Sequence, residues 1–285
     1  MVRTGVRTWA DSWIRRRGRI LLVGTGAVVV VLGLGVGLLV ARTGSGTKHR
    51  PTDAQSYRPS RSAPASTTTT GATPATAEDE LAKLAPGARA VAYVKGPSVT
   101  VYPTPQVGAP AATLSNPNSL GAPLVFLVQS ARGNWLDVLL PQRPNGASGW
   151  IQSSTVRLYS DDFTVVVHLG AHTLELYQAG RLVQTHEVAV GNPASPTPPG
   201  QFYVTELVAS GDPNGAYGPY AFGLSDFSNT YTEFDGGPGQ VAIHGTDEPW
   251  VIGSSASHGC VRLENSQLLT LVKVLPVGTP VLITP

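Results

Sequence analysis

The sequence predicts a mostly β protein, with two folded β domains behind an N-terminal transmembrane helix and a disordered tether. Three observations predict this order. Residues 20–40 are an uncharged apolar run, residues 41–85 are rich in Ser, Thr, Pro and Ala, and residues 86–285 carry short apolar runs separated by Gly, Pro and Asn. The first pattern is typical of a membrane span, the second of disorder, and the third of strands joined by turns.

The first forty residues predict a cytoplasmic basic segment and one membrane anchor. Residues 1–19 hold six arginines against a single acid, Asp11. As a helix, the 21 residues of 20–40 would be about 31 Å long, which matches a hydrocarbon core of about 30 Å. The positive-inside rule places the N-terminus in the cytoplasm, so we expect a single-pass cell-membrane protein with an extracytoplasmic folded part. A cleaved signal peptide is the alternative, but its apolar region is usually shorter.

Residues 41–85 predict a flexible tether. The stretch "SAPASTTTTGATPATA" lies at its centre, and Tyr57 is its only aromatic residue. Such a composition cannot bury enough apolar surface to offset the entropy of ordering. The tether would let the folded part work away from the membrane.

The folded part is acidic. From residue 86 onward, eight Lys or Arg face thirteen Asp or Glu, which gives a net charge near −5. This charge argues against nucleic acid as a partner, because that binding depends on neutralising phosphates.

Residues 86–159 predict a small β domain. Short apolar runs such as "AVAYV", "VTVYP" and "LVFLV" alternate with turn residues, and "RPNGASG" contains an Asn-Gly hairpin signal. The order "NWLDVLLP", a polar turn and "GWI" resembles bacterial SH3-like domains that accompany wall enzymes. A generic β spacer is the alternative.

Residues 160–285 predict a second β-rich domain with one clear helix. "LELYQAGRLVQTHEVAVG" reads as a hairpin with an Ala-Gly turn. Near the C-terminus, Asn265 is a candidate helix cap, and Pro276 ends the apolar spacing of the helix. That spacing is set by Leu268, Leu271, Val272 and Leu275.

The chain's only cysteine, Cys260, lies in "SSASHGCVRL". Outside the cytoplasm it has no partner for an internal disulfide, so it is an intermolecular link, a buried bystander or a reactive thiol. A free thiol of pKa about 8.5 is only about 3% ionised at pH 7, and lowering the pKa to about 6 would raise the thiolate about thirtyfold. A neighbouring histidine suits this task, because it can take the proton and return it to a leaving amine.

Two histidines are candidates for this base. His258 lies two residues before Cys260, so on an extended strand both would share a face. His244, sixteen residues before Cys260 at the end of the strand "VAI", could reach the sulfur from a separate strand. We expect His244 to be the base and His258 to shape the site, while the consecutive N–H groups of Gly259 and Cys260 could stabilise an oxyanion.

These motifs resemble the L,D-transpeptidase catalytic domain, the YkuD-type cysteine enzymes of bacterial peptidoglycan. The resemblance covers about residues 161–283 and rests on "IHGT", "SHGCVRL", "TPPG", "YGPYAFGLS" and "FDGGPGQVAIHG". It implies a β-sandwich in which Cys260 attacks the third residue of a tetrapeptide stem and terminal D-alanine leaves. An amine of a second stem then resolves the thioester into a 3→3 cross-link. It also implies peptidoglycan stem peptides as partners, inhibition by carbapenems, and no cofactor or metal.

The same resemblance implies roles for further residues. The carbonyl of Gly245 would orient His244, and Ser257 would lie at the site. Thr246 and Tyr220 are candidates for substrate contact, with core packing the alternative for Tyr220. Many members carry Asn where this chain has Arg262. Arg262 could bind a substrate carboxylate, or it could pair with Asp247 or Glu264 and brace the loop.

Three other functions stay open from the sequence. Water could replace the amine and make the protein an L,D-carboxypeptidase with the same site. The tether and the SH3-like block would also suit a non-catalytic peptidoglycan-binding wall protein. Metal-dependent hydrolysis through His244, His258 and Cys260 lacks the paired ligand spacing of a zinc site.

Overall fold

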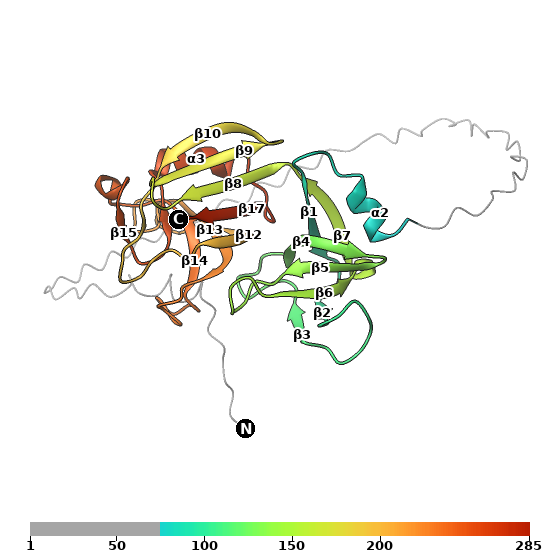
Figure 1. Cartoon of the computed structure of the whole chain (residues 1–285). Coiled ribbons are helices and arrows are strands. Elements are labelled where there is room, and N and C mark those ends of the chain that lie inside the picture. Colours follow the sequence, from blue (N-terminus) through green and yellow to red (C-terminus); the bar gives the residue numbers. More distant parts are fainter. Residues whose placement is uncertain (1–74) are drawn as a thin grey trace, which may run out of the picture. The chain divides into compact units, whose positions relative to one another are not determined.

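The computed structural model describes residues 75–285, whose elements are labelled in Figure 1. The predicted cytoplasmic segment (residues 1–19), the membrane helix (residues 20–40) and most of the tether lie outside the described residues. From residue 75 to the C-terminus, no helix is both long enough and apolar enough to span a membrane.

The end of the predicted tether differs from the expectation, because helix α2 covers Ala77–Ala82. Thr76 caps it: its side chain accepts from the backbone N–H of Asp79, and the Asp79 carboxylate accepts from the backbone N–H of Thr76. Acidic residues fill the first turn, where their negative charges interact favourably with the positive end of the helix dipole. Leu81 and Leu84 then pack against the core of the first β domain, which stabilises so short a helix.

The first β domain is a five-stranded antiparallel sheet with a two-stranded ribbon. The sheet order is β6-β5-β4-β1-β7, and β2 pairs with β3. A bridge between Tyr102 and Trp150 joins the ribbon to β6. The elements are β1 (Arg89–Val94), β2 (Ser98–Val101), β3 (Ala112–Ser115), β4 (Val125–Arg132), β5 (Trp135–Leu139), β6 (Ser148–Gln152), η1 (Ser153–Thr155) and β7 (Val156–Asp161). The likeness to SH3-like domains stays a prediction.

The second domain is built on an eight-stranded sheet of order β10-β9-β8-β17-β12-β13-β14-β16, with β11 and β15 as a separate parallel pair. Figure 1 shows β10, β9, β8 and β17 side by side. The strands are β8 (Phe163–His168), β9 (Thr173–Gln178), β10 (Arg181–Glu187), β11 (Val190–Gly191), β12 (Gly200–Ala209), β13 (Tyr220–Phe227), β14 (Gln240–His244), β15 (Ser255–Ser257), β16 (Val261–Arg262) and β17 (Pro280–Thr284). The helices are η2 (Pro249–Val251) and α3 (Asn265–Val272).

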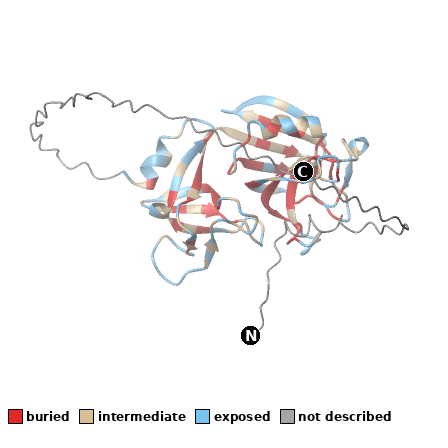
Figure 2. Ribbon diagram, turned by 180° about the vertical axis from the view of Figure 1, so that it is seen from behind, coloured by how far each residue is buried: buried red, intermediate tan, exposed pale blue. Residues whose placement is uncertain are grey.

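The long strand β12 curls this sheet into a sandwich-like form. Its first residues, Gly200 to Tyr203, pair with β17, whereas Val204 and the residues after it pair with β13. The two halves of the sheet therefore face a shared core, in which the buried side chains of Val165, Phe222 and Ile243 meet. Figure 2 shows the buried residues gathered on the strands of both domains. The predicted hairpin is present as β9 and β10, joined at Ala179 and Gly180 with positive φ.

The predicted C-terminal helix is present as α3, but its cap differs. Glu264 is the N-cap residue and makes no side-chain cap bond, while Asn265 is the first helical residue. The Asn265 amide oxygen accepts instead from the backbone N–H of Thr246, 2.9 Å away. Asn265 therefore ties α3 to the loop after β14, and Leu268 and Leu271 bury the apolar face.

Candidate active site

Strand register brings His244 and Cys260 to one face of the sheet. β14 and β16 run parallel, with Ile243 opposite Val261 and His244 opposite Arg262. Cys260 directly precedes β16, so it lies level with Ala242, whose backbone is a hydrogen-bond partner of the thiol. Because opposite residues and residues two apart share a face, Cys260 and His244 project from the same side of two adjacent strands.

His244 is buried, and its orientation is set by the next residue. Its Nδ1 lies 2.5 Å from the carbonyl oxygen of Gly245. Because a carbonyl can only accept, Nδ1 carries the proton, and the lone pair of the neutral ring is on Nε2. The Tyr217 ring packs against the imidazole, with 4.8 Å between centroids. Burial lowers the pKa of His244 to about 4, against the raising effect of the Gly245 carbonyl, and the Arg262 charge lowers it further.

The thiol has a high pKa rather than the low one that the sequence suggested. Burial raises the pKa of Cys260 to about 11, although the Ala242 backbone bond and the Arg262 charge both lower it. The neighbours do not lower the pKa of Cys260 below its ordinary value, because burial destabilises the thiolate more than they stabilise it. Near pH 7 the site therefore holds a neutral thiol and a neutral imidazole, so His244 would remove the proton during attack.

The "SHGC" turn is braced by hydroxyl groups. Ser257 Oγ donates to the carbonyl of Cys260 (2.5 Å) and accepts from the N–H of Gly259 (3.1 Å). Thr197 Oγ1 donates to the carbonyl of Gly259 (2.8 Å) and accepts from the N–H of Gly191 (2.8 Å). Gly259 has φ +121°, a conformation that favours glycine.

This turn changes three expectations. Gly259 is not a free oxyanion donor here, because its N–H is bonded to Ser257. The Ser257 hydroxyl lies next to Cys260, and both of its hydrogen bonds go to the backbone of its own turn. His258 and Cys260 do not share an extended strand, since β15 ends at Ser257 and β16 begins at Val261. His258 is exposed, and its ring meets Tyr231 and Phe234 at centroid distances of 6.1 and 5.6 Å.

Arg262 pairs with an acid that the sequence reasoning did not select. Its Nη1 lies 3.0 Å from Glu248 Oε2. The sequence leaves open a brace through Asp247 or Glu264, and the structure has the ion pair with Glu248 instead. The backbone after Asp247 turns into η2, which directs the Glu248 carboxylate to the arginine. The Nε of Arg262 is buried without a hydrogen-bond partner. The ion pair thus uses only part of the guanidinium. Its positive charge still lowers the pKa values of Cys260 and His244.

Two predicted substrate contacts have other partners in the structure. The Thr246 hydroxyl accepts from the N–H of Glu248 at 3.0 Å, so this buried residue braces the loop after His244. Tyr220 packs against the sandwich core, and Tyr217 is the tyrosine that touches His244.

Sequence reasoning missed Asp226, which is fully buried in β13. Its Oδ1 accepts from Asn145 of the first β domain at 2.7 Å, and its Oδ2 is buried without a partner. Burial raises the pKa of Asp226 to about 8. Its negative form also raises the pKa of Cys260, which places the two groups within electrostatic range. A single acid within the apolar run "YAFGLSDF" is the sequence signal that could have drawn attention to it.

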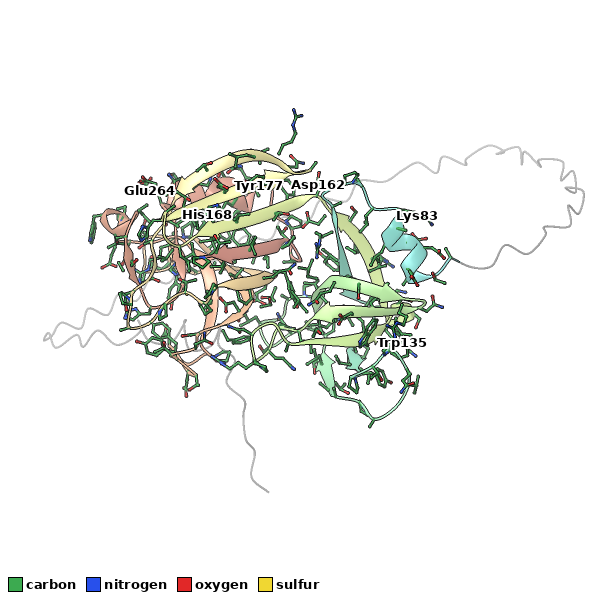
Figure 3. The ribbon with its side chains drawn as sticks, in the orientation of Figure 1. Lys83, Trp135, Asp162, His168, Tyr177 and Glu264 are labelled. Carbon is green, nitrogen blue, oxygen red and sulfur yellow. The ribbon has the colours of Figure 1, made fainter. Side chains whose placement is uncertain are left out.

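The remaining histidines of the second domain lie in other environments. His168 on β8 and Tyr177 on the adjacent strand β9 are labelled in Figure 3. Both side chains bond to Glu175. His172 bonds to Ser255, and His186 to Gln184. Within residues 75–285, no group of three or more His, Cys, Asp or Glu side chains is arranged to hold a metal ion.

Comparison with known families assigns the second domain. The YkuD family model, described as the L,D-transpeptidase catalytic domain, matches residues 162–283, a range that holds both His244 and Cys260. The curated YkuD protein of Bacillus licheniformis is 36% identical over 123 residues, which cover 43% of this chain and 66% of the relative. The YkuD protein of Bacillus subtilis is 33% identical over 125 residues, which cover 44% and 68%. The chain thus spans about two thirds of the length of these relatives.

Solved structures of L,D-transpeptidases also match. One from Mycobacterium smegmatis is 18% identical with a TM-score of 0.35, covering 50% of this chain and 76% of that chain. The catalytic domain of an E. faecium L,D-transpeptidase is 22% identical with a TM-score of 0.34, covering 44% of this chain and 98% of that chain. An L,D-transpeptidase solved in complex with imipenem is 16% identical with a TM-score of 0.35, covering 74% and 88%.

Proposed function

Because this chain belongs to the YkuD family of L,D-transpeptidase catalytic domains, we propose that it is a peptidoglycan L,D-transpeptidase that forms 3→3 cross-links. The observation that carries the proposal is the placement of His244, at the end of β14, beside Cys260, the residue that directly precedes the neighbouring parallel strand β16. A neutral base with its free lone pair on Nε2, next to the chain's only thiol, suits acyl transfer through a thioester.

The first half-reaction releases D-alanine. His244 Nε2 takes the Cys260 proton as the sulfur attacks the carbonyl carbon of the third stem residue. The tetrahedral intermediate collapses, the bond to D-alanine breaks, and the imidazolium gives its proton to the departing amine. The stem is left as a thioester on Cys260, and the ring is neutral again.

The second half-reaction forms the cross-link. The side-chain amine of a second stem attacks the thioester carbonyl and gives a proton to His244. The carbon–sulfur bond breaks, the thiolate recovers that proton, and a new amide joins the two stems. One amide is broken and one is made, so the reaction needs no ATP and no cofactor.

Two further groups stabilise the negative charge that develops during the reaction. With the Gly259 N–H bonded to Ser257, we assign the backbone N–H of Cys260 as the oxyanion donor. The charge of Arg262 favours the thiolate as it forms and opposes early protonation of His244. The relative solved with imipenem supports carbapenems as acylating inhibitors of Cys260.

We place the reaction on the cell-wall side of the membrane. The basic segment and apolar run of residues 1–40 support a single-pass anchor with a cytoplasmic N-terminus. Peptidoglycan stem peptides then lie in the compartment of the folded domains.

The test is incubation of the purified full-length protein with a disaccharide-tetrapeptide, followed by mass spectrometry of the muropeptides. We expect cross-linked dimers and free D-alanine, both absent with Cys260→Ala. Tripeptide without dimers would show an L,D-carboxypeptidase. Binding to purified sacculi without turnover, unchanged in Cys260→Ala, would show a non-catalytic wall protein. Dimers from the Cys260→Ala variant would overturn the mechanism.

A further inference from the structure

The segment between β13 and β14, residues 228–239, lies beside the turn that carries Cys260. Tyr231 and Phe234 of this segment pack against His258, two residues before the thiol. Burial raises the pKa of Tyr217, and charges on Cys260 and Asp235 raise it further, so the segment and the thiol lie within electrostatic range of one tyrosine. Residues 228–239 are therefore close neighbours of the "SHGC" turn.

The segment forms a closed loop with a narrow neck. The N–H of Ser228 donates to the carbonyl of Gly239 at 2.8 Å, which joins the two ends. Ser228 Oγ accepts from the N–H groups of Thr230 and Tyr231 at 3.1 and 3.0 Å. Gly239 has φ +69°, and a Cβ there would lie 2.0 Å from the Tyr231 carbonyl oxygen, so the neck admits only glycine.

One arginine of the first β domain holds this neck. Arg143 lies in the connection between β5 and β6. Its Nη1 donates to the carbonyl of Pro238 (2.8 Å), and its Nη2 donates to the carbonyls of Ser228 and Tyr231 (both 3.0 Å). The guanidinium also packs on the Phe227 ring, 4.9 Å from its centroid. The planar guanidinium has several N–H donors at fixed positions, so it can bind carbonyl groups at both ends of the loop. A lysine ammonium group is a single compact charge and cannot reach both ends equally well.

Asn145, two residues further along the same connection, binds the strand that leads into the neck. Its Oδ1 accepts from the N–H of Phe227 at 3.0 Å. Its Nδ2 donates to the Phe227 carbonyl at 2.8 Å and to Asp226 Oδ1 at 2.7 Å. The side chain thus pairs with Phe227 as a neighbouring strand would.

We propose that Arg143 and Asn145 are positioning residues of the second domain's site. They fix residues 228–239 so that Tyr231 and Phe234 stay against His258, and they thereby set the access of ligands to Cys260. The first β domain thereby helps to hold the surroundings of Cys260 in place, and is more than a spacer between the second domain and the membrane. An effect of Arg143 and Asn145 on turnover of stem peptides rests on the proposed function. Their effect on the access of ligands to Cys260 does not.

The chain offers a matched control at another contact between the same two domains. Tyr203 is fully buried, and its hydroxyl donates to the carbonyls of Val125 and Leu139 at 3.1 and 3.4 Å. Tyr203→Phe removes these bonds and leaves the contacts of Arg143 unchanged. A general loosening of the two domains would affect both variants, whereas loss of the loop anchor would affect only the Arg143 variants.

The test compares full-length wild type with Arg143→Ala, Arg143→Lys, Asn145→Ala and Tyr203→Phe. Hydrogen–deuterium exchange should rise at least about tenfold in residues 228–239 of Arg143→Ala, since three charge-assisted bonds are lost. With imipenem as the probe, the half-saturating concentration for acylation should rise about tenfold, while the limiting rate changes less than about threefold. Lysine should restore part of both effects, and Asn145→Ala should show a smaller change in the same direction.

Two results would overturn the proposal. One is exchange in residues 228–239 that rises no more in Arg143→Ala than in Tyr203→Phe. The other is an unchanged half-saturating concentration despite raised exchange. If the wild type takes up no imipenem, alkylation of Cys260 by a bulky maleimide replaces it as the measure of access. A wild type that keeps this anchor but turns over no stem peptide would count against the proposed function alone.

Discussion

The ionisation of Cys260 gives a prediction that depends on the structure and not on the family. Burial raises its pKa from an ordinary 9.0 to about 11. At pH 7 the thiolate fraction is then about one in ten thousand, against about one in a hundred for the exposed thiol. Because the thiolate is the form that reacts, alkylation should be about a hundredfold slower in the folded protein than in the unfolded chain.

Iodoacetamide is the suitable probe, because it is small and needs no general base. Cys260 is the only cysteine, so a single mass increase measured on the intact full-length protein reports this thiol alone. The folded-state rate should rise about tenfold per pH unit from pH 7 to pH 10, while the rate in urea levels off near pH 9. His244→Gln should change this alkylation rate only a few-fold. The same variant should slow acylation by a stem peptide by about a hundredfold or more, because there the base must act.

A folded-state alkylation rate that no longer rises with pH above pH 7 would contradict a raised pKa of Cys260. Such a profile would mean that thiolate and imidazolium form a stable pair before substrate arrives. His244 would then not be held neutral by burial, and proton removal during attack would be the wrong description of the site.

Three other variants test the surroundings of the thiol. Burial raises the pKa of Asp226 to about 8, so between pH 5 and pH 8 the folded state keeps a proton that the unfolded chain loses. The free energy of unfolding of the wild type should therefore fall by roughly 3–4 kcal/mol over this range. Urea unfolding of Asp226→Asn should show no such fall. Arg262→Leu should raise the pKa of His244 from about 4, and the acidic limb of the acylation profile should move to higher pH; an unmoved limb would exclude the charge effect. Thr197→Val removes the hydroxyl bonds that link Gly191 and Gly259 and should cost about 1–3 kcal/mol in urea unfolding, with Thr197→Ser near wild type; equal losses in both would point to packing instead.

Many strands could be predicted because their signals are local. The runs "AVAYV", "VTVYP" and "LVFLV" became β1, β2 and β4, and the Ala179–Gly180 turn joins β9 and β10 where the sequence placed it. Helix α2 was not predicted, because its only sequence signal is a capping box of four residues, Thr76 to Asp79, next to a stretch rich in Ser, Thr, Pro and Ala. The curl of the second sheet could not be predicted from pattern, because it depends on β12 pairing with different strands along its length.

The candidate site divides in the same way. His244 and Cys260 stand in short motifs and could be selected from sequence. The direction of the Cys260 pKa could not, because it depends on how much solvent the folded chain removes from the sulfur. The contacts of Arg143 and Asn145 join residues more than eighty positions apart, which no local pattern reports.

The central claim is that Cys260 carries the stem peptide as a thioester. The most direct measurement is tandem mass spectrometry of the full-length protein, quenched in acid shortly after mixing with a disaccharide-tetrapeptide. We expect one adduct, equal in mass to the substrate less D-alanine, on the peptide that contains Cys260. Hydroxylamine should release it, and Cys260→Ala should lack it. An adduct on another residue, or cross-linked product formed without any adduct on Cys260, would contradict it.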